Sequence, residues 1–226
     1  MGQQTVTDGR RARGDASRRV VLAQAVDLAS IEGLDQLSIA RIADAAGVGK
    51  SSVATLFGSK ERLQLATVET ASARFAATVI APARVHPRGV RRLVALLDRV
   101  VAYSQDRVFP GGCFFSAAAA DFHAKPGQVR DAVAAQLDDW LGYLALTARF
   151  AAERGELPGL DPAGDEPEQL AFEIQGTFEL MNLLAVIRDD ELPYLRARRA
   201  YRARLLALGV PAELAERVLE PGAALR

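Results

Sequence analysis

Reactive side chains are few in this sequence, and their spacing matches none of the common catalytic or metal-binding patterns. Cys113 is the one cysteine, and His123 follows it along the chain. A thiol near an imidazole could act as a nucleophile or a redox sensor. A cysteine that precedes Phe114 and Phe115 more often packs as a small buried hydrophobic residue, which is our interpretation here. We predict no catalytic residue, no metal site and no cofactor, because His, Cys and carboxylate residues nowhere have ligand spacing.

The string Gly47-Val48-Gly49-Lys50-Ser51 suggests a phosphate-binding loop, because Gly-Lys-Ser ends that motif. The motif also requires a glycine at the position of Asp44 and a preceding strand. Neither requirement is met. We therefore reject a nucleotide-binding loop.

The same region is better explained by polar side chains on a short helix. Residues 38–57 read as two short helices joined by Ala46-Gly47-Val48-Gly49, which is typical of a helix-turn-helix. Gly47 can adopt the left-handed conformation of a sharp turn, and Val48 can fill the angle between the helices. The second helix then presents groups that fit a major groove roughly 12 Å wide. These are Lys50, Ser51, Ser52 and Thr55.

Apolar residues recur at helical spacing along nearly the whole chain, and alternating β-branched runs do not occur, so we predict an all-α fold. Gly33 is placed to end the first helix, and Ser38 to cap the second. Proline, glycine and polar residues mark the other breaks. The predicted helices are 17–32, 38–46, 50–57, 60–80, 88–104, 112–124, 127–154, 166–188, 192–208 and 211–219.

The length of 226 residues favours a small domain plus a medium one. We expect a basic disordered arm at 1–16, a three-helix helix-turn-helix domain at 17–65, and a larger helical domain at 66–226. The long helix 60–80 joins the two domains. The start of the chain carries a local excess of three positive charges, which would either touch phosphates or form a solvated tail. Its charged residues are Asp8, Arg10, Arg11, Arg13, Asp15, Arg18 and Arg19.

Composition restricts the partners and the compartment. Twenty-eight basic residues balance 28 acidic ones, so any DNA affinity must come from local charge. A single cysteine fits a reducing compartment, and there is neither a signal-peptide core nor an apolar run near the ~20 residues that span a bilayer. We expect a cytoplasmic protein without a membrane partner.

Two segments are similar to the signature of a known family. The similarity is close over residues 17–65, and beyond them it is limited to helix layout and the stretch Gly111-Gly112-Cys113-Phe114-Phe115. The two segments are Leu37-Ser38-Ile39-Ala40-Arg41-Ile42-Ala43-Asp44-Ala45-Ala46-Gly47-Val48-Gly49-Lys50 and Leu56-Phe57-Gly58-Ser59-Lys60-Glu61-Arg62-Leu63.

The chain thus resembles the tetracycline-repressor (TetR) family of bacterial regulators. The resemblance implies that the second short helix enters the major groove, with Lys50, Ser51, Ser52 and Thr55 facing DNA. It also implies backbone contacts from Ser38, Arg41 and Lys60. The chain departs from the family where Ala54 and Thr55-Leu56 replace the usual aromatic and the usual Tyr or His, which predicts a weaker or differently specified operator.

Aromatic residues concentrate in the C-terminal half, where clefts between helices commonly hold apolar ligands. Aromatic residues at helical spacing are more often ordinary core. The polar Gln175 and Glu179 could orient a ligand or lie at a dimer interface. Our predicted ligand-binding set is Phe114, Phe115, Phe122, Trp140, Phe172, Gln175, Phe178 and Glu179.

The resemblance also implies that residues 66–226 form a ligand-sensing and dimerisation domain. In the implied homodimer, helices 166–188 and 192–208 pair with their mates as a four-helix bundle. A twofold dimer fits a palindromic operator in double-stranded DNA, because two recognition helices about 34 Å apart match successive major grooves. We expect a repressor whose operator affinity a small-molecule effector modulates. The apolar stripe for dimer contact consists of Leu180, Leu183, Leu184 and Ile187.

The alternative function is a helical enzyme or ligand carrier whose N-terminal module is structural.

Overall fold

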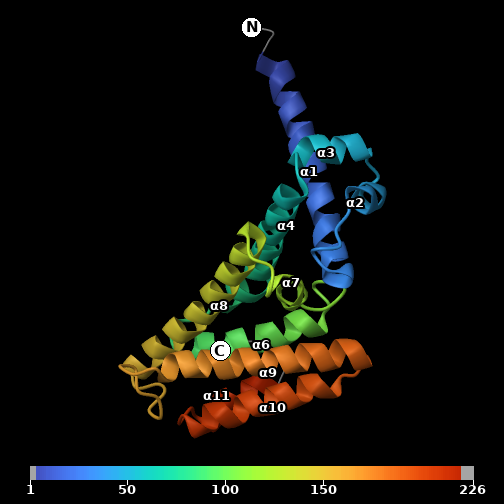
Figure 1. The fold of residues 1–226 in the computed structure, drawn as a ribbon. Helices are drawn as coiled ribbons and strands as arrows, with labels where there is room; N and C mark the ends of the chain where they lie inside the picture. The colour runs from blue at the N-terminus through green and yellow to red at the C-terminus, as the bar shows by residue number, and fades with distance from the viewer. Residues whose placement is uncertain (1–3, 220–226) are drawn as a thin grey trace. The chain divides into compact units, whose positions relative to one another are not determined.

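The computed structural model describes residues 4–219, with side chains from Gly14 onward. The described chain is helical without a strand, which confirms the predicted all-α class (Figure 1). Its helices are α1 (Gln4–Glu32), α2 (Ile39–Ala46), α3 (Lys50–Phe57), α4 (Lys60–Phe75), the π-helix η1 (Ala76–Ile80), α5 (Ala81–Ala83), α6 (Val90–Gln105), α7 (Phe114–Phe122), α8 (Gln128–Glu153), α9 (Glu166–Arg188), α10 (Leu192–Ala207), α11 (Ala212–Ala215) and the 3-10 helix η2 (Glu216–Leu219).

The first helix is longer than the sequence analysis predicted. We expected it to follow a disordered arm at 1–16, whereas α1 begins at Gln4. A continuous helix is possible here because residues 4–32 contain no proline, so no position lacks its backbone amide donor. The side chains of Arg10, Arg11 and Arg13 lie outside the described residues.

The chain divides into two compact units that differ from the predicted domains. Unit 1 comprises residues 1–72 and 109–134, and unit 2 comprises residues 73–108 and 135–226. The predicted boundary after residue 65 therefore lies a few residues early, and it omits a second segment that belongs with the N-terminal helices. Sequence order alone gave no sign that 109–134 would pack there, because the pairing joins residues far apart in the chain.

Close packing of α1 against the loop before α7 explains why residues 109–134 belong to unit 1. The Gly111 amide donates a hydrogen bond to Ser30 Oγ at 3.1 Å. A Cβ atom at Gly111 would lie 1.9 Å from the carbonyl oxygen of Ser30, so only glycine permits this approach. A second contact joins the loop after α1 to α7, where the Asp35 amide donates to Asp121 Oδ2 at 3.0 Å. The end of α1 and the α1–α2 loop are thereby fastened to α7.

Unit 2 is built on α6, α9 and α10, which pack against one another along their lengths (Figure 1). Its core comes from aliphatic and aromatic side chains of these helices, for example Leu93, Tyr103 and Tyr201, each at most 3% exposed. Within the described range, α9 is the one helix long and apolar enough to cross a membrane by length and composition. Its packing against α6 and α10 accounts for the buried part of that apolar character.

The helix that begins at Lys60 passes from unit 1 into unit 2 and changes geometry there. Its α4 part gives way to the π-helix η1, after which Pro82 stands in the short helix α5. Pro82 lacks the amide that would bond to the Thr78 carbonyl, and its ring crowds that carbonyl. A widened π turn accommodates the proline without ending the helix.

Candidate nucleic-acid interface

The turn between α2 and α3 is formed by backbone geometry that the sequence predicted. Ser38 caps α2, with its hydroxyl accepting a hydrogen bond from the Arg41 amide at 3.2 Å. Gly47 ends α2 in the left-handed conformation, at φ 64° and ψ 31°. The Val48 amide then donates to the Ala43 carbonyl at 3.0 Å. The two short helices are therefore joined at a fixed angle, as in a helix-turn-helix.

The two sides of α3 differ sharply in burial. Val53 and Phe57 are 0% and 6% exposed and pack toward α1 and α2, together with the fully buried Ile42. The polar residues of α3 lie on the opposite, exposed side, which is the arrangement that the sequence predicted. Contact between these residues and DNA stays a prediction. The exposed set is Lys50, Ser51, Ser52, Ala54 and Thr55.

The Thr55 hydroxyl makes a hydrogen bond within α3 and can still accept another one. Its hydroxyl donates to the Ser51 carbonyl at 2.8 Å, one turn back along α3. The hydroxyl proton is thus engaged, while the oxygen lone pairs and the methyl group still face solvent. A side chain in this state can accept a hydrogen bond from a base or contact a thymine methyl group. Lys50 contributes the one formal charge on this exposed face.

The predicted backbone contacts already have partners within unit 1. The Arg41 guanidinium forms an ion pair with Glu32. Lys60 Nζ donates to the Asp35 carbonyl at 2.6 Å and lies 4.0 Å from Asp35 Oδ1. Both side chains remain exposed, so a phosphate would compete with these acidic partners rather than meet a free cation.

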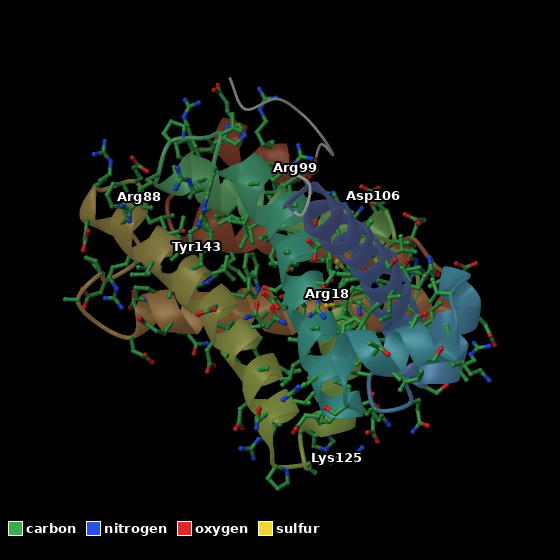
Figure 2. The ribbon with its side chains drawn as sticks, turned by 90° about the horizontal axis from the view of Figure 1, so that it is seen from above. Arg18, Arg88, Arg99, Asp106, Lys125 and Tyr143 are labelled. Carbon is green, nitrogen blue, oxygen red and sulfur yellow. The ribbon has the colours of Figure 1, made fainter. Side chains whose placement is uncertain are left out.

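Asp35 contacts both Lys60 and Lys125, although the sequence analysis did not select it. Lys125, in the loop between α7 and α8 (Figure 2), places its Nζ 2.8 Å from Asp35 Oδ2. This hydrogen bond, with the charges of Lys125 and Lys60, lowers the pKa of the Asp35 carboxyl, against the opposing effect of its burial. The charged carboxylate therefore links the start of α4 to the segment that follows α7.

Arg18 is a second residue that sequence reasoning missed. Its guanidinium lies 4.6 Å from the centre of the Phe57 ring and donates to the Leu56 carbonyl at 3.4 Å. A cation over an aromatic face and a donor at a helix C-terminus are both favourable. Arg18 thereby holds the end of α3 against α1. In the sequence it looked like one arginine of a basic arm, and no local pattern distinguished it.

Replacement of Ser38 tests its capping role. We expect Ser38→Ala to lower the free energy of unfolding by about 1 kcal/mol, because the Arg41 amide loses its acceptor. Urea denaturation followed by circular dichroism measures the loss. Ser38→Asp is the matched control, since aspartate also caps helices, and it should retain the stability. Equal stability of Ser38→Ala and the parent protein would contradict the role.

The predicted ligand-binding residues are divided between the two units. Phe114, Phe115 and Phe122 belong to unit 1. There Phe114 is fully buried, with its ring centre 5.8 Å from that of Phe109 and 5.2 Å from that of Phe115. Lys125 Nζ lies 5.4 Å from the Phe122 ring centre. These three phenylalanines therefore belong to unit 1, whereas the other five residues of the predicted set belong to unit 2.

A second group from the predicted set lies together in unit 2. The Trp140 indole donates to Gln175 Oε1 at 2.9 Å, and Gln175 Nε2 donates to Glu179 Oε1 at 2.7 Å. The sequence analysis did not select Phe75 and Tyr103, which complete this aromatic cluster. Ring centres lie 5.2 Å apart for Phe75 and Trp140, 5.2 Å for Phe75 and Tyr103, and 6.1 Å for Tyr103 and Phe178.

Phe172 does not join that cluster. The sequence analysis placed it with Phe178, but Phe172 is 68% exposed whereas Phe178 is 3% exposed. Six residues are far from a whole number of helical turns, so the two side chains point to different sides of α9. Phe172 instead belongs with an exposed apolar stripe. The other large members of the stripe on α9 are Leu180, Leu183 and Ile187, between 56% and 72% exposed.

The structure agrees with the interpretation of Cys113 as a packing residue rather than a nucleophile or redox sensor. Cys113 is buried, as predicted for a small hydrophobic residue, and His123 is exposed. His123 Nδ1 lies 2.9 Å from the Ala120 carbonyl on its own helix segment. In the described part of the chain, no three His, Cys, Asp or Glu side chains are grouped to hold a metal ion.

A helix-turn-helix packed against a long first helix, followed by a larger helical unit, defines a class of DNA-binding transcriptional regulator. Family comparison gives the particular family. Residues 21–67 match the model described as bacterial regulatory proteins, tetR family, and residues 89–201 match the tetracyclin repressor-like C-terminal domain. The chain belongs to the TetR family of transcriptional regulators.

Solved structures agree with this assignment. A TetR transcriptional regulator from Chloroflexus aurantiacus is 26% identical, with a TM-score of 0.71 over 92% of this chain and 97% of that one. A TetR-family regulator from Agrobacterium tumefaciens shares the fold at 18% identity, with a TM-score of 0.73 over 84% and 98%. AibR, solved with isovaleryl coenzyme A and operator DNA, shares it at 20% identity, with a TM-score of 0.57 over 75% and 85%. No curated protein matches the chain.

Proposed function

We propose that this chain is a dimeric repressor that binds a palindromic operator through α3 and responds to a small apolar effector held in its C-terminal helical region. The observation that carries the proposal is that one side of α3 is buried and the other side, which carries its polar residues, is exposed. Val53 and Phe57 fix the helix to its own unit, while Lys50 and the small hydroxyl residues beside it stay exposed. A short helix with this surface fits the major groove, where its side chains can reach base edges and phosphates. Since DNA is the proposed partner, we place the protein in the bacterial cytoplasm.

Dimer formation is supported by the exposed stripe on α9 and its continuation on α10. Leu192 and Leu195, near the start of α10, are 39% and 51% exposed, and α10 packs against α9. Large contiguous apolar surfaces on soluble proteins usually mark an interface. A second copy would cover this one by twofold symmetry, which places two α3 helices on one duplex. The half-sites would then lie about one DNA turn apart.

The proposed effector response needs two states whose operator affinities differ. A coupling of about 1 to 3 kcal/mol between the sites is sufficient for the response. The helix from Lys60 to Ile80 is the proposed connection, because it runs through both units and contains the π-helix η1. The Trp140 cluster is one candidate for contact with the effector. AibR, with its coenzyme A ligand and operator, is a structural neighbour that has both kinds of partner.

A change at Lys50 tests whether α3 contacts DNA. We expect Lys50→Ala to weaken binding roughly tenfold on every DNA sequence, because a phosphate contact is lost rather than a base contact. The slope of log K against log salt concentration should also become less steep by about one, as expected for the loss of one phosphate contact. Fluorescence anisotropy at several salt concentrations measures both quantities. Arg154→Ala is the control, because Arg154 is an exposed residue that directly follows α8, and it should leave both quantities unchanged. Parent-like affinity of Lys50→Ala would remove this residue from the interface.

A further inference from the structure

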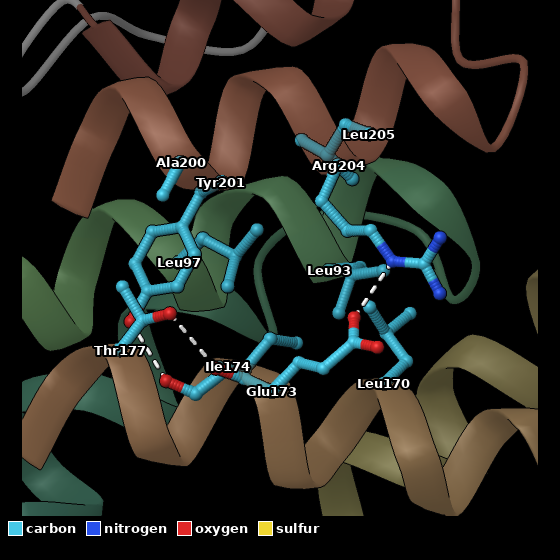
Figure 3. A pocket seen from close by; sticks show the side chains of 10 residues that line it. All are labelled: Leu93, Leu97, Leu170, Glu173, Ile174, Thr177, Ala200, Tyr201, Arg204 and Leu205. Carbon is cyan, nitrogen blue, oxygen red and sulfur yellow. Dashed lines mark hydrogen bonds and ion pairs between the residues drawn. The ribbon is translucent and has the colours of Figure 1, made fainter. Parts of the chain in front are cut away.

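A cavity of about 110 Å³ lies within unit 2 between α6, α9 and α10 (Figure 3). It is distinct from the Trp140 cluster, because it is bordered by other residues of α9. Most of its lining is aliphatic and buried. Apart from Ala200, the apolar lining consists of Leu93, Leu97, Leu170, Ile174 and Leu205, each at most 4% exposed.

The hydroxyl groups that face this cavity already donate their hydrogens to the backbone. Tyr201 Oη donates to the Ile174 carbonyl at 3.0 Å, and Thr177 Oγ1 donates to the Glu173 carbonyl at 2.9 Å (Figure 3). Burial raises the pKa of Tyr201, so this phenol stays neutral. A bound molecule would therefore meet the Tyr201 ring and aliphatic carbon rather than free donors.

The charged residues at the edge of the cavity neutralise each other. Arg204 Nε lies 2.7 Å from Glu173 Oε2, and the pair joins α10 to α9 at one end of the lining (Figure 3). Both side chains are partly exposed, at 39% and 37%. An anion would meet Glu173 and a cation would meet Arg204, so each would have to break this pair. The charges favour a neutral occupant.

We infer that this cavity binds a small neutral aromatic molecule of about benzene size and is the site of the effector in the proposed function. Apolar cavities of about 150 Å³ in proteins stay dry and bind benzene, so a space of this order suits a single ring. The site also lies between the two helices proposed for the dimer and α6. An occupant there can change the packing of α9 on α10, and with it the distance between the two α3 helices. This regulatory part rests on the proposed function, whereas binding itself does not.

Toluene is the probe for binding, and thermal unfolding of the full chain is the measurement. We expect the Tm of the parent protein to rise by roughly 3 to 6 °C at about ten times the Kd. Leu97→Phe fills the cavity from α6, and Ala200→Phe fills it from the exposed side of α10, so each should abolish the rise. The second variant leaves the buried core intact and keeps the test valid if Leu97→Phe does not fold.

Trp140→Phe tests the other candidate effector site, because it alters the aromatic cluster around Trp140 and leaves the cavity lining unchanged. This variant should keep the toluene response. No rise in the parent protein, or a rise lost in Trp140→Phe and kept in both filling variants, would overturn the inference.

Operator binding separates this inference from the proposed function. Gel-shift titration with and without toluene should show at least a fivefold loss of affinity in the parent protein and none in Ala200→Phe. Toluene binding with unchanged operator affinity would overturn the effector assignment and leave the cavity as a binding site. Sequence-specific DNA binding without any toluene response would overturn the claim that the cavity binds an aromatic molecule, and would leave the proposed repressor function unaffected. Absence of specific DNA binding would overturn the proposed repressor, and with it the effector assignment, but not the binding of toluene in the cavity.

Discussion

Asp98→Ala is expected to lower the free energy of unfolding by about 3 to 5 kcal/mol, because it leaves a buried positive charge without its partner. Arg198 is 2% exposed, and its Nη1 lies 2.7 Å from Asp98 Oδ1 and 2.7 Å from the Val218 carbonyl. Its Nη2 is buried with no hydrogen-bond partner among the described residues, so the guanidinium depends heavily on this one carboxylate. The pair joins α6 to α10 and anchors η2.

Urea denaturation at one fixed protein concentration measures this loss, since dimer formation also affects apparent stability. Asp139→Ala is the control, because Asp139 is exposed on α8 and its loss should cost less than about 0.5 kcal/mol. Replacing the pair together, as Asp98→Leu with Arg198→Met, should recover most of the stability. A loss below 1 kcal/mol for Asp98→Ala would show that the charge is solvated rather than buried.

Leu180→Glu combined with Leu183→Glu is expected to convert the proposed dimer to monomers and to weaken operator binding on the order of 100-fold or more. The two leucines are 58% and 56% exposed, so the folded chain loses little internal packing when they change. Four carboxylates would meet across a twofold interface, which is strongly unfavourable. Each monomer then binds a half-site without the gain of a second linked contact.

Analytical ultracentrifugation and a gel shift on the same samples measure the two effects. Leu146→Glu is the control, because Leu146 is 60% exposed on α8 and lies outside the stripe. It should leave both the mass and the affinity unchanged. A double variant that sediments as the parent protein does would mean that α9 does not form the interface.

The sequence predicted most helices because their limits are set by local chemistry. Gly47 provides a left-handed residue at the turn, and α9 begins and ends at the predicted Glu166 and Arg188. The predicted start of the first helix was wrong, because we interpreted the basic residues as a disordered arm, whereas α1 begins at Gln4 and no proline interrupts residues 4–16. Capping and turn residues therefore predict the ends of helices more reliably than charged residues predict a disordered segment.

The candidate sites were harder to predict because they depend on pairs that are distant in sequence. The exposed face of α3 followed from helical spacing within a few residues. The Asp35–Lys125 contact and the cavity edge formed by Glu173 and Arg204 depend on how separate helices pack, which periodicity does not encode. Phe172 illustrates the same limit, because an aromatic residue on an apolar helix can belong to the core or to an interface.

The central claim is that the exposed side of α3 reads DNA from a twofold pair of chains. Gel-shift titration of the full chain against the DNA upstream of its own gene, at about 50 and 200 mM salt, tests it most directly. We predict a discrete complex on that DNA that a scrambled duplex does not displace, and an affinity that falls steeply at the higher salt. Equal binding to both duplexes, or none at either salt, would contradict the claim.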